Sequence, residues 1–165
     1  MKKPLTNYAF IDSQNLNLNI RKLGWILDFK RFRIYLQEKY AVKVAYIFIG
    51  YISENKQLYQ FLKHVGYEII FKEVVHQEGK PKGNVDAELV LQAMIDYDRY
   101  EQALIVTSDG DFACLVRYLD QQGKLNRVIS PDRTNCSSLL QKAARHKIDY
   151  IENARRKLEY KNPVK

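Results

Sequence analysis

Strand-like and helix-like segments alternate along this chain, and this alternation limits the fold more than any other feature of the sequence. Short apolar, β-branched or aromatic runs predict strands at 8–11, 42–49, 67–71, 103–107 and 127–130, with a shorter one at 150–151. Helical spacing of apolar residues fills most of the intervals between them. Unbroken apolar strands separated by helices are typical of a parallel sheet covered on both faces. We therefore expect an α/β fold, a three-layer sandwich around a mainly parallel sheet of five or six strands.

Several element boundaries are marked by individual residues. Asp28 is placed to cap a helix that runs to about residue 39, and Ser53 is placed to cap a helix that Gly66 ends. The segment 76–84 is polar and contains glycine and proline, so we expect a loop there. It leads into a helix at about 85–97 that begins close to Asp86.

The length and composition fit one globular domain. The chain has 165 residues, of which 46% are hydrophobic and 28% are charged, and no segment resembles a linker or a repeat. We expect a single domain over 1–165, with a core at about 8–151 and a basic C-terminal helix or tail at about 152–165. The apolar runs are too short for a membrane span, and the sequence has only two cysteines, so we expect a cytoplasmic protein. We expect Cys114 to pack in the core and Cys136 to be the more exposed thiol.

Charge is distributed unevenly along the chain. The net charge is +8, but residues 1–43 carry +6, residues 44–140 carry −3 and residues 141–165 carry +5. Such a surface can simply keep a protein soluble. Two basic ends around an acidic middle also suit a polyanionic partner such as nucleic acid, provided that the acidic part has chemistry to perform on it.

The acidic residues of the middle region lie where the predicted strands end. Asp12 directly follows the first strand, Asp109 and Asp111 follow the fourth, and Asp86 lies at the start of the helix before the fourth. In an open parallel sheet the functional site lies at the carboxyl ends of the strands. Each aspartate alone fits a helix cap or the first turn of a helix. Together they predict one cluster of four carboxylates.

A carboxylate cluster needs a counter-charge. Two carboxylates about 4 Å apart repel each other by roughly 4 kcal/mol at an effective dielectric constant of about 20. Protonation or a bound cation relieves this repulsion. A few carboxylates with waters suit Mg²⁺ or Mn²⁺ better than Zn²⁺. We therefore expect Asp12, Asp86, Asp109 and Asp111 to lie within reach of one Mg²⁺ or Mn²⁺ ion.

Three motifs in this chain resemble those of a known family. They are I-D-x-x-N-L at 11–16, K-G-x-x-D at 82–86 and T-S-D-G-D-F at 107–112, the last followed by L-V-x-x-L at 115–119. In order and spacing they are similar to the NYN domain, the LabA-like branch of the PIN-like ribonuclease superfamily. The resemblance covers about residues 8–151.

The resemblance implies a Rossmann-like, PIN-like sheet and metal-dependent hydrolysis of RNA phosphodiester bonds by a metal-activated water. It assigns catalytic and metal-binding roles to Asp12, Asp86, Asp109 and Asp111, with Asn15 and Ser108 as supporting polar groups. The implied enzyme is a Mg²⁺- or Mn²⁺-dependent (endo)ribonuclease that leaves a 5′-phosphate, and the sequence leaves the choice between endo- and exonuclease mode open. Its implied partner is RNA, in single-stranded or structured form.

Basic side chains are expected near the same edge of the sheet. Those placed on predicted loops or at element starts can hold phosphates without reading bases; they are Lys80, Lys82, Arg127, Arg133 and Lys142. Ordinary surface charge is the alternative interpretation for each of them.

Other function classes were weighed against a nuclease. A nucleic-acid-binding regulatory module with the same fold and little or no cleavage remains the main alternative. A phosphatase of the haloacid dehalogenase type needs a second acid two residues after the first aspartate, and Gln14 stands there. The sequence leaves a homodimer open.

Overall fold

A six-stranded parallel sheet forms the centre of the molecule. The computed structural model describes residues 6–72, 75–77, 80–82 and 86–162. The strands lie in the order β3-β2-β1-β6-β7-β8, each parallel to its neighbours. They are β1 (Asn7–Asp12), β2 (Val42–Gly50), β3 (Glu68–Lys72), β6 (Ala103–Val106), β7 (Leu125–Ser130) and β8 (Ile148–Tyr150). The prediction of a mainly parallel sheet with up to six strands is confirmed.

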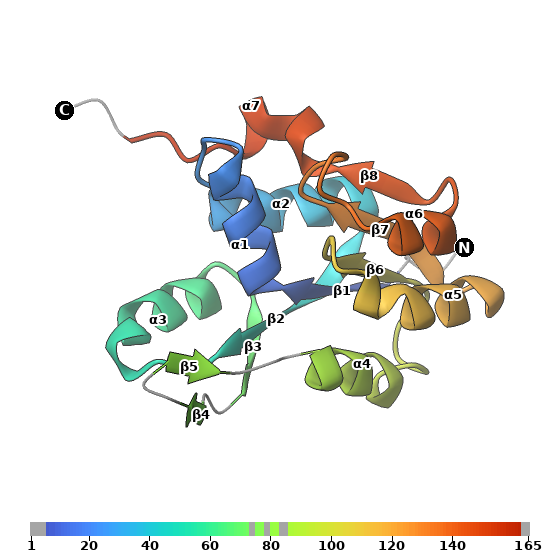
Figure 1. The fold of residues 1–165 in the computed structure, drawn as a ribbon, viewed down its shortest axis with the longest axis horizontal. Coiled ribbons are helices and arrows are strands. Elements are labelled where there is room, and N and C mark those ends of the chain that lie inside the picture. Colours follow the sequence, from blue (N-terminus) through green and yellow to red (C-terminus); the bar gives the residue numbers. More distant parts are fainter. Residues whose placement is uncertain (1–5, 73–74, 78–79, 83–85, 163–165) are drawn as a thin grey trace.

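Helices cover both faces of this sheet (Figure 1). One face carries α1 (Ser13–Lys22), α2 (Phe29–Tyr40), α3 (Lys56–His64) and α7 (Arg155–Leu158), and the other carries α4 (Asp86–Ile95), α5 (Ala113–Gln121) and α6 (Ser138–Ala144). Short 3-10 helices (Ser53–Asn55, Gly110–Phe112, Ile151–Ala154) precede α3, α5 and α7. None of the helices in the described part of the chain is long and apolar enough to cross a membrane.

Side chains of the strands alternate between two apolar cores. Ala9 and Ile11 of β1 pack in the core that includes Leu16 and Leu158, while Phe10 packs in the core on the other face. All five are fully buried. Because Leu158 belongs to one of these cores, the chain still packs against the domain beyond residue 151. The three-layer α/β architecture is therefore the one predicted.

Two of the predicted aspartate caps form, at Asp12 and Asp28. The predicted cap at Ser53 does not form, because its hydroxyl donates to the Glu54 carboxylate (3.0 Å) and Asn55 precedes α3. The Asp28 side chain accepts a hydrogen bond from the backbone N–H of Arg31 (3.1 Å) and caps α2 as predicted. In the same way Asp12 accepts from the N–H of Asn15 (3.3 Å) and caps α1. Asp12 thus ends β1 and begins α1, which holds its carboxylate at the carboxyl edge of the sheet.

The segment predicted as a loop at 76–84 contains two short strands. β4 (Val75–Gln77) and β5 (Lys80–Lys82) pair as an antiparallel hairpin apart from the main sheet. Each strand has only three residues, and one contains Pro81, so neither shows the apolar alternation from which a strand is predicted. This correction leaves the order of the main sheet unchanged.

Candidate functional site

The strand order reverses between β1 and β6. From β1 the chain adds β2 and β3 on one side, and later adds β6, β7 and β8 on the other. Ligands of open α/β sheets bind at such a reversal, outside the carboxyl ends of the strands. Asp12 ends β1 there, and Asp109 follows β6 by three residues. The topology therefore brings two of the predicted acidic segments together.

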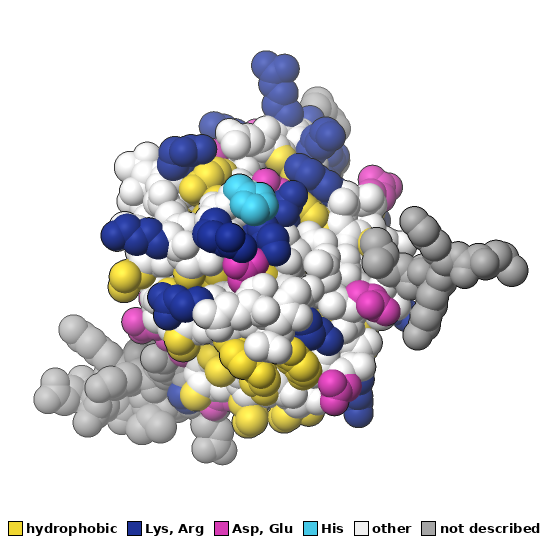
Figure 2. All heavy atoms as spheres, turned by 90° about the vertical axis from the view of Figure 1, so that its right-hand side faces the viewer, with side chains coloured by type: hydrophobic (Ala, Val, Ile, Leu, Met, Phe, Trp, Pro, Cys, Tyr) yellow, Lys and Arg dark blue, Asp and Glu magenta, His cyan; other side chains and the backbone are white. Residues whose placement is uncertain are grey.

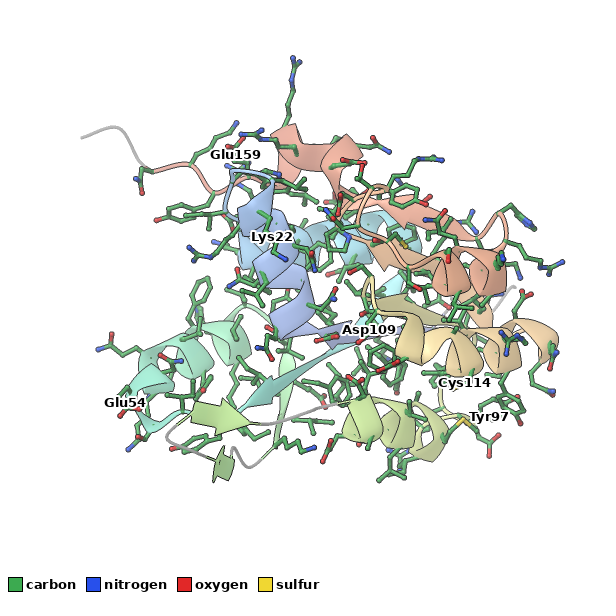
Figure 3. All side chains as sticks on the ribbon, viewed as in Figure 1. Lys22, Glu54, Tyr97, Asp109, Cys114 and Glu159 are labelled. Atoms are coloured by element: carbon green, nitrogen blue, oxygen red, sulfur yellow. The ribbon has the colours of Figure 1, made fainter. Side chains whose placement is uncertain are left out.

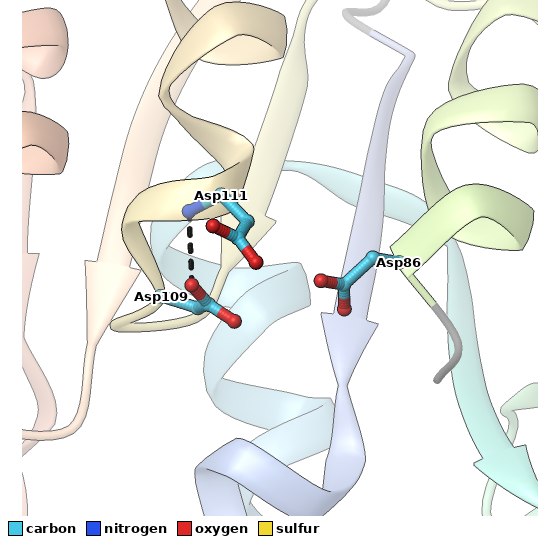
Figure 4. Close-up of side chains that lie close together, drawn as sticks. All are labelled: Asp86, Asp109 and Asp111. Atoms are coloured by element: carbon cyan, nitrogen blue, oxygen red, sulfur yellow. Dashed lines mark hydrogen bonds between the residues drawn. The ribbon is translucent and has the colours of Figure 1, made fainter. Parts of the chain in front are cut away.

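Three of the four predicted carboxylates form a cluster. One carboxylate oxygen from each of Asp86, Asp109 and Asp111 lies within 4.8 Å of the other two. Asp86 extends from the start of α4, above the end of β1, toward the pair on the other side (Figure 4). Asp109 accepts a hydrogen bond from the backbone N–H of Asp111 (2.9 Å), which holds this pair in one tight turn. Asp109 lies near the centre of the molecule (Figure 3).

Asp12 lies beside this cluster but outside the 4.8 Å group. Its side chain is buried, and the second carboxylate oxygen accepts a hydrogen bond from the Thr107 hydroxyl (3.3 Å). The pKa of Asp12 is raised to about 6, first by burial and also by the negative charges of Asp86 and Asp109, while its hydrogen bonds from Asn15 and Thr107 act in the opposite direction. The carboxyl group is therefore electrostatically part of the cluster, although its oxygen atoms are not among the closest ones.

Asn15 and Ser108, the predicted supporting residues, contact each other directly. The Asn15 side-chain oxygen accepts hydrogen bonds from the backbone N–H (2.9 Å) and the hydroxyl (3.0 Å) of Ser108. Their contact ties α1 to the loop that carries Asp109. Both residues position the loop, because the Asn15 oxygen is already engaged by Ser108.

Two further residues of this network were not predicted from the sequence. The Thr107 hydroxyl donates to Asp12 and accepts from the backbone N–H of Asp109 (3.1 Å), so it links the two carboxylates. Asn19 donates to the Asn15 backbone oxygen (2.8 Å) and lies 3.4 Å from the Ser108 hydroxyl. The signal for Asn19 was its helical spacing of four residues from Asn15.

Gly110 allows the loop to pack against α6. A Cβ atom at this position would lie 2.4 Å from the Ser137 hydroxyl oxygen and 3.1 Å from the Ser137 Cβ. The Ser137 backbone N–H donates to the carbonyl oxygen of Ser108 (3.1 Å). The turn that presents Asp109 and Asp111 is therefore held from both sides, by α1 and by α6.

The cluster fits a small hard cation by its donor set. Oxygen ligands bind Mg²⁺ at about 2.1 Å, so two ligands on opposite sides of the ion lie about 4.2 Å apart. The 4.8 Å limit on the separations between Asp86, Asp109 and Asp111 is close to this value, and a small side-chain rotation closes the difference. The chemistry and spacing of the donors fit Mg²⁺ or Mn²⁺.

The motifs and this geometry agree with a comparison to protein-family models. The NYN domain model matches residues 8–152, nearly the whole chain. The chain belongs to the NYN domain family. NYN domains have a nuclease-like fold.

A solved structure shares the fold of this NYN domain. A crystal structure of a protein of unknown function from Vibrio parahaemolyticus superimposes with a TM-score of 0.79 and 20% sequence identity, covering 97% of this chain and 100% of the other. It supports the fold alone. A comparison with curated proteins finds no match.

The structure describes the side chains of three of the five predicted RNA-binding cations, Arg127, Arg133 and Lys142. The side chains of Lys80 and Lys82 lie outside the described residues. Arg127 lies within β7 instead of at the rim, and its guanidinium is 3.6 Å from the Asp149 carboxylate. Arg133, in the loop after β7, and Lys142, on α6, are exposed and available to a ligand.

The two cysteines of this NYN domain have the reverse of the predicted exposures. Cys114 is exposed on α5 (Figure 3). Cys136 is buried, and its sulfur lies 3.9 Å from the Ser137 carbonyl oxygen. The prediction was wrong because the turn at 131–137 folds under α6, which a local sequence pattern does not reveal. Burial raises the pKa of the Cys136 thiol.

Proposed function

We propose that this chain is a metal-dependent ribonuclease that hydrolyses RNA phosphodiester bonds at Asp12, Asp86, Asp109 and Asp111. The observation that carries the proposal is the cluster of three carboxylates at the strand-order reversal of an NYN domain. If these aspartates only capped helices, nothing would require Asp86 to lie close to Asp109 and Asp111, which come from a different segment. The substrate class rests on the family's nuclease-like fold and on the net charge of +8.

Asp86, Asp109 and Asp111 would hold a Mg²⁺ or Mn²⁺ ion. When bound, such an ion makes a water molecule more acidic and neutralises charge on the phosphoryl oxygens. Hydrolysis then forms a bond between the water oxygen and phosphorus and breaks the bond from phosphorus to O3′. The products are a 5′-phosphate and a 3′-hydroxyl.

Asp12 and its neighbours have a distinct part in this proposal. Because Asp12 lies outside the closest group, it would act on a bound ion through a water molecule and not as a direct ligand. Its pKa of about 6 lies nearer to neutrality than that of an ordinary aspartate, which suits a group that accepts a proton from the attacking water. Thr107 holds one Asp12 oxygen, and Asn15 and Ser108 fix the loop that carries Asp109.

A binding module with little cleavage is the second candidate. The observation that favours it is the position of Asp12 outside the 4.8 Å group, which leaves three carboxylates for the ion instead of four. The two candidates differ in one measurable property, the metal-dependent rate of RNA cleavage.

The test compares the intact protein with Asp111→Asn and a matched control, Asp98→Asn. Asp98 is an exposed aspartate in the turn after α4, outside the carboxylate group. We expect the wild type and Asp98→Asn to cleave labelled single-stranded RNA in Mn²⁺ and to be inactive in EDTA. Asp111→Asn should lose at least about 100-fold in rate, since the ion is held by two carboxylates instead of three. RNA that stays intact with wild type in both Mg²⁺ and Mn²⁺, yet is bound, would favour the binding module.

A further inference from the structure

We propose that a groove across the outer edge of β8 holds the phosphate backbone of the RNA whose scissile bond lies at the carboxylate cluster. The inference rests on the proposed function for the identity of the polyanion. The groove itself follows from the structure, and its charge can be tested without any cleavage.

The groove is large and runs around the last strand of the sheet. It has a volume of about 1180 Å³ and extends from Tyr35 and Lys39 of α2, past β8, to Lys142 of α6. Among the described residues no strand pairs with the outer edge of β8. The backbone N–H groups of such an edge are available to donate to phosphate oxygens.

The fold brings the two basic ends of the chain together in this groove. Lys39 comes from the basic N-terminal part, while Lys142, Arg156 and Lys157 come from the basic C-terminal part. The segment before α2 is joined to α7 because the Asp28 N–H donates to the Leu158 carbonyl oxygen (2.8 Å). Two regions of positive charge that are far apart in sequence thus form one surface.

Several cations of the groove have no acidic partner. Arg133, Lys142, Arg156 and Lys157 are exposed and form no ion pair with any side chain in the described ranges. Within the described part of the chain Lys39 likewise has no acidic partner, and its ammonium group donates to the Tyr35 hydroxyl (3.1 Å). These side chains can therefore bind an anion without first breaking a salt bridge.

The acidic side chains in the groove are already engaged. Asp149 accepts a hydrogen bond from the Tyr40 hydroxyl (2.5 Å) and lies 3.6 Å from the Arg127 guanidinium. Glu152 accepts from the backbone N–H of Arg133 (3.1 Å). The lining sets seven Lys and Arg side chains against these two carboxylates, so positive charge dominates in the groove. The face of the molecule with α6 and β8 shows Lys and Arg side chains gathered around a histidine (Figure 2).

The groove begins at the same sheet edge as the carboxylates. Arg133 lies in the loop that follows β7, and its guanidinium carbon is 4.8 Å from the centre of the Tyr150 ring at the end of β8. β8 is two strand spacings from β6, or about 10 Å. A chain of phosphates seated in the groove can thus continue to the turn that holds Asp109.

A nucleic acid fits this surface better than an acidic peptide does. An extended peptide gains affinity by adding a strand to a sheet edge, but β8 offers only three residues for such pairing. A polynucleotide uses regularly spaced charges and needs no long strand. Arg133 and Lys142, two of the predicted RNA-binding residues, both line the groove.

The test removes three groove charges and compares this with the loss of three charges elsewhere. The groove variant is Lys142→Gln, Arg156→Gln and Lys157→Gln in one chain. The control is Lys43→Gln, Lys56→Gln and Lys63→Gln, which are exposed lysines on β2 and α3, outside the groove. Binding of a labelled single-stranded RNA is measured by anisotropy in EDTA at several salt concentrations, with polyglutamate of equal charge as the competing polyanion.

We expect the groove variant to bind RNA at least tenfold more weakly than the control. Its log–log salt slope should fall by about 2, because each lost phosphate contact removes about 0.7. Equal affinities of the two triple variants, or no RNA binding by wild type, would overturn the proposal. Polyglutamate that binds as tightly as RNA would also overturn it and indicate an acidic protein partner.

Measurements of RNA cleavage distinguish a failure of the groove proposal from a failure of the nuclease proposal. If wild type cleaves RNA, the groove variant should show a raised KM with kcat within about twofold of wild type, since the carboxylates are untouched. If wild type does not cleave but the groove variant alone loses RNA affinity, the nuclease proposal fails and the groove stands. If wild type cleaves RNA but the two triple variants bind RNA equally well, the nuclease proposal stands and the groove proposal fails.

Discussion

The side-chain oxygen of Asn15 accepts two hydrogen bonds from Ser108, at 2.9 Å from its backbone nitrogen and 3.0 Å from its hydroxyl. Asn15 lies three residues after Asp12, and Ser108 lies directly before Asp109. This pair therefore sets the position of one candidate catalytic segment relative to the other. Because Ser108 is buried, its N–H depends on an acceptor within the protein, and Asn15 supplies it.

Asn15→Ala should lower the free energy of unfolding by about 1–3 kcal/mol, the cost of a buried donor left without an acceptor. RNA cleavage should fall as well, because the loop that carries Asp109 loses its link to α1. The control is Asn17→Ala on the same helix, whose side chain makes no hydrogen bond with the described residues. Denaturant melts of both variants measure the difference. A loss in Asn15→Ala no larger than in Asn17→Ala would show that the pair does not hold the loop.

The variant Asp109→Asn distinguishes two roles for Asp109, that of a metal ligand and that of a helix cap. Asparagine keeps an oxygen that accepts from the Asp111 N–H, so the turn is retained. Removing one negative charge from the cluster should raise the melting temperature in EDTA, because like-charge repulsion is relieved. Excess Mn²⁺ should then stabilise the variant less than wild type, since a weaker-binding ion adds less by mass action.

Asp28→Asn is the matched control for this experiment. Asp28 caps α2 with the same kind of bond but lies outside the carboxylate group. Its replacement should leave the response to Mn²⁺ unchanged. If Asp109→Asn and Asp28→Asn melt alike with and without Mn²⁺, Asp109 is a helix cap and nothing more.

The raised pKa of Asp12 gives the metal-free protein a distinctive pH dependence. Between pH 3.8 and about 6 the folded state keeps the proton that the unfolded state has lost, so stability falls as the pH rises through this window. A shift from 3.8 to about 6 corresponds to about 3 kcal/mol, fully lost above pH 6. In EDTA, Asp12→Asn should therefore be more stable than wild type at pH 7 and gain little or nothing at pH 4.

Melts of wild type and Asp12→Asn across pH 4–7.5 measure this difference. Asp98→Asn should follow the wild-type curve throughout, because Asp98 is exposed. Excess Mg²⁺ should reduce the difference in stability between Asp12→Asn and wild type at pH 7, since a cation stabilises the ionised form of Asp12. A wild-type protein that gains stability relative to Asp12→Asn as the pH rises would contradict the assignment.

Periodicity predicted the sheet because each strand of the centre is buried on both faces. Runs such as Tyr8–Ile11 have few polar residues to suggest another structure, and their alternation with helices leaves few arrangements open. The hairpin β4–β5 escaped prediction because its stability does not come from an apolar alternation. The exposures of Cys114 and Cys136 were reversed because they depend on which helix covers the turn at 131–137.

From the sequence, the aspartates are expected to meet only if β1 and β6 are assumed to be neighbours in the sheet. The placement of Asp109 after a strand follows from sequence, but the exclusion of Asp12 from the closest group depends on its bonds to Asn15 and Thr107. The basic groove could not be predicted, because the two basic ends are far apart in the sequence and meet only in the folded chain, through contacts such as the hydrogen bond from the Asp28 N–H to the Leu158 carbonyl oxygen.

Gly110 offers a test of how tightly the turn is held. In Gly110→Ala the new Cβ would meet the Ser137 hydroxyl oxygen at 2.4 Å and the Ser137 Cβ at 3.1 Å. Rotation of the hydroxyl relieves the first contact but not the second, so the turn must move away from α6. We expect a loss of about 1–3 kcal/mol in unfolding free energy. Cleavage should fall too, since Asp109 and Asp111 move with the turn.

The double variant Gly110→Ala with Ser137→Gly decides whether this contact is the cause. Ser137→Gly alone should cost little, because Ser137 makes no side-chain capping bond and glycine is tolerated at a helix N-cap. The pair together should recover most of the stability and activity that Gly110→Ala loses, with a coupling energy of about 1 kcal/mol or more. Strictly additive losses in urea melts would mean that Gly110 is needed for another reason, and that the turn carrying Asp109 and Asp111 is not positioned by α6.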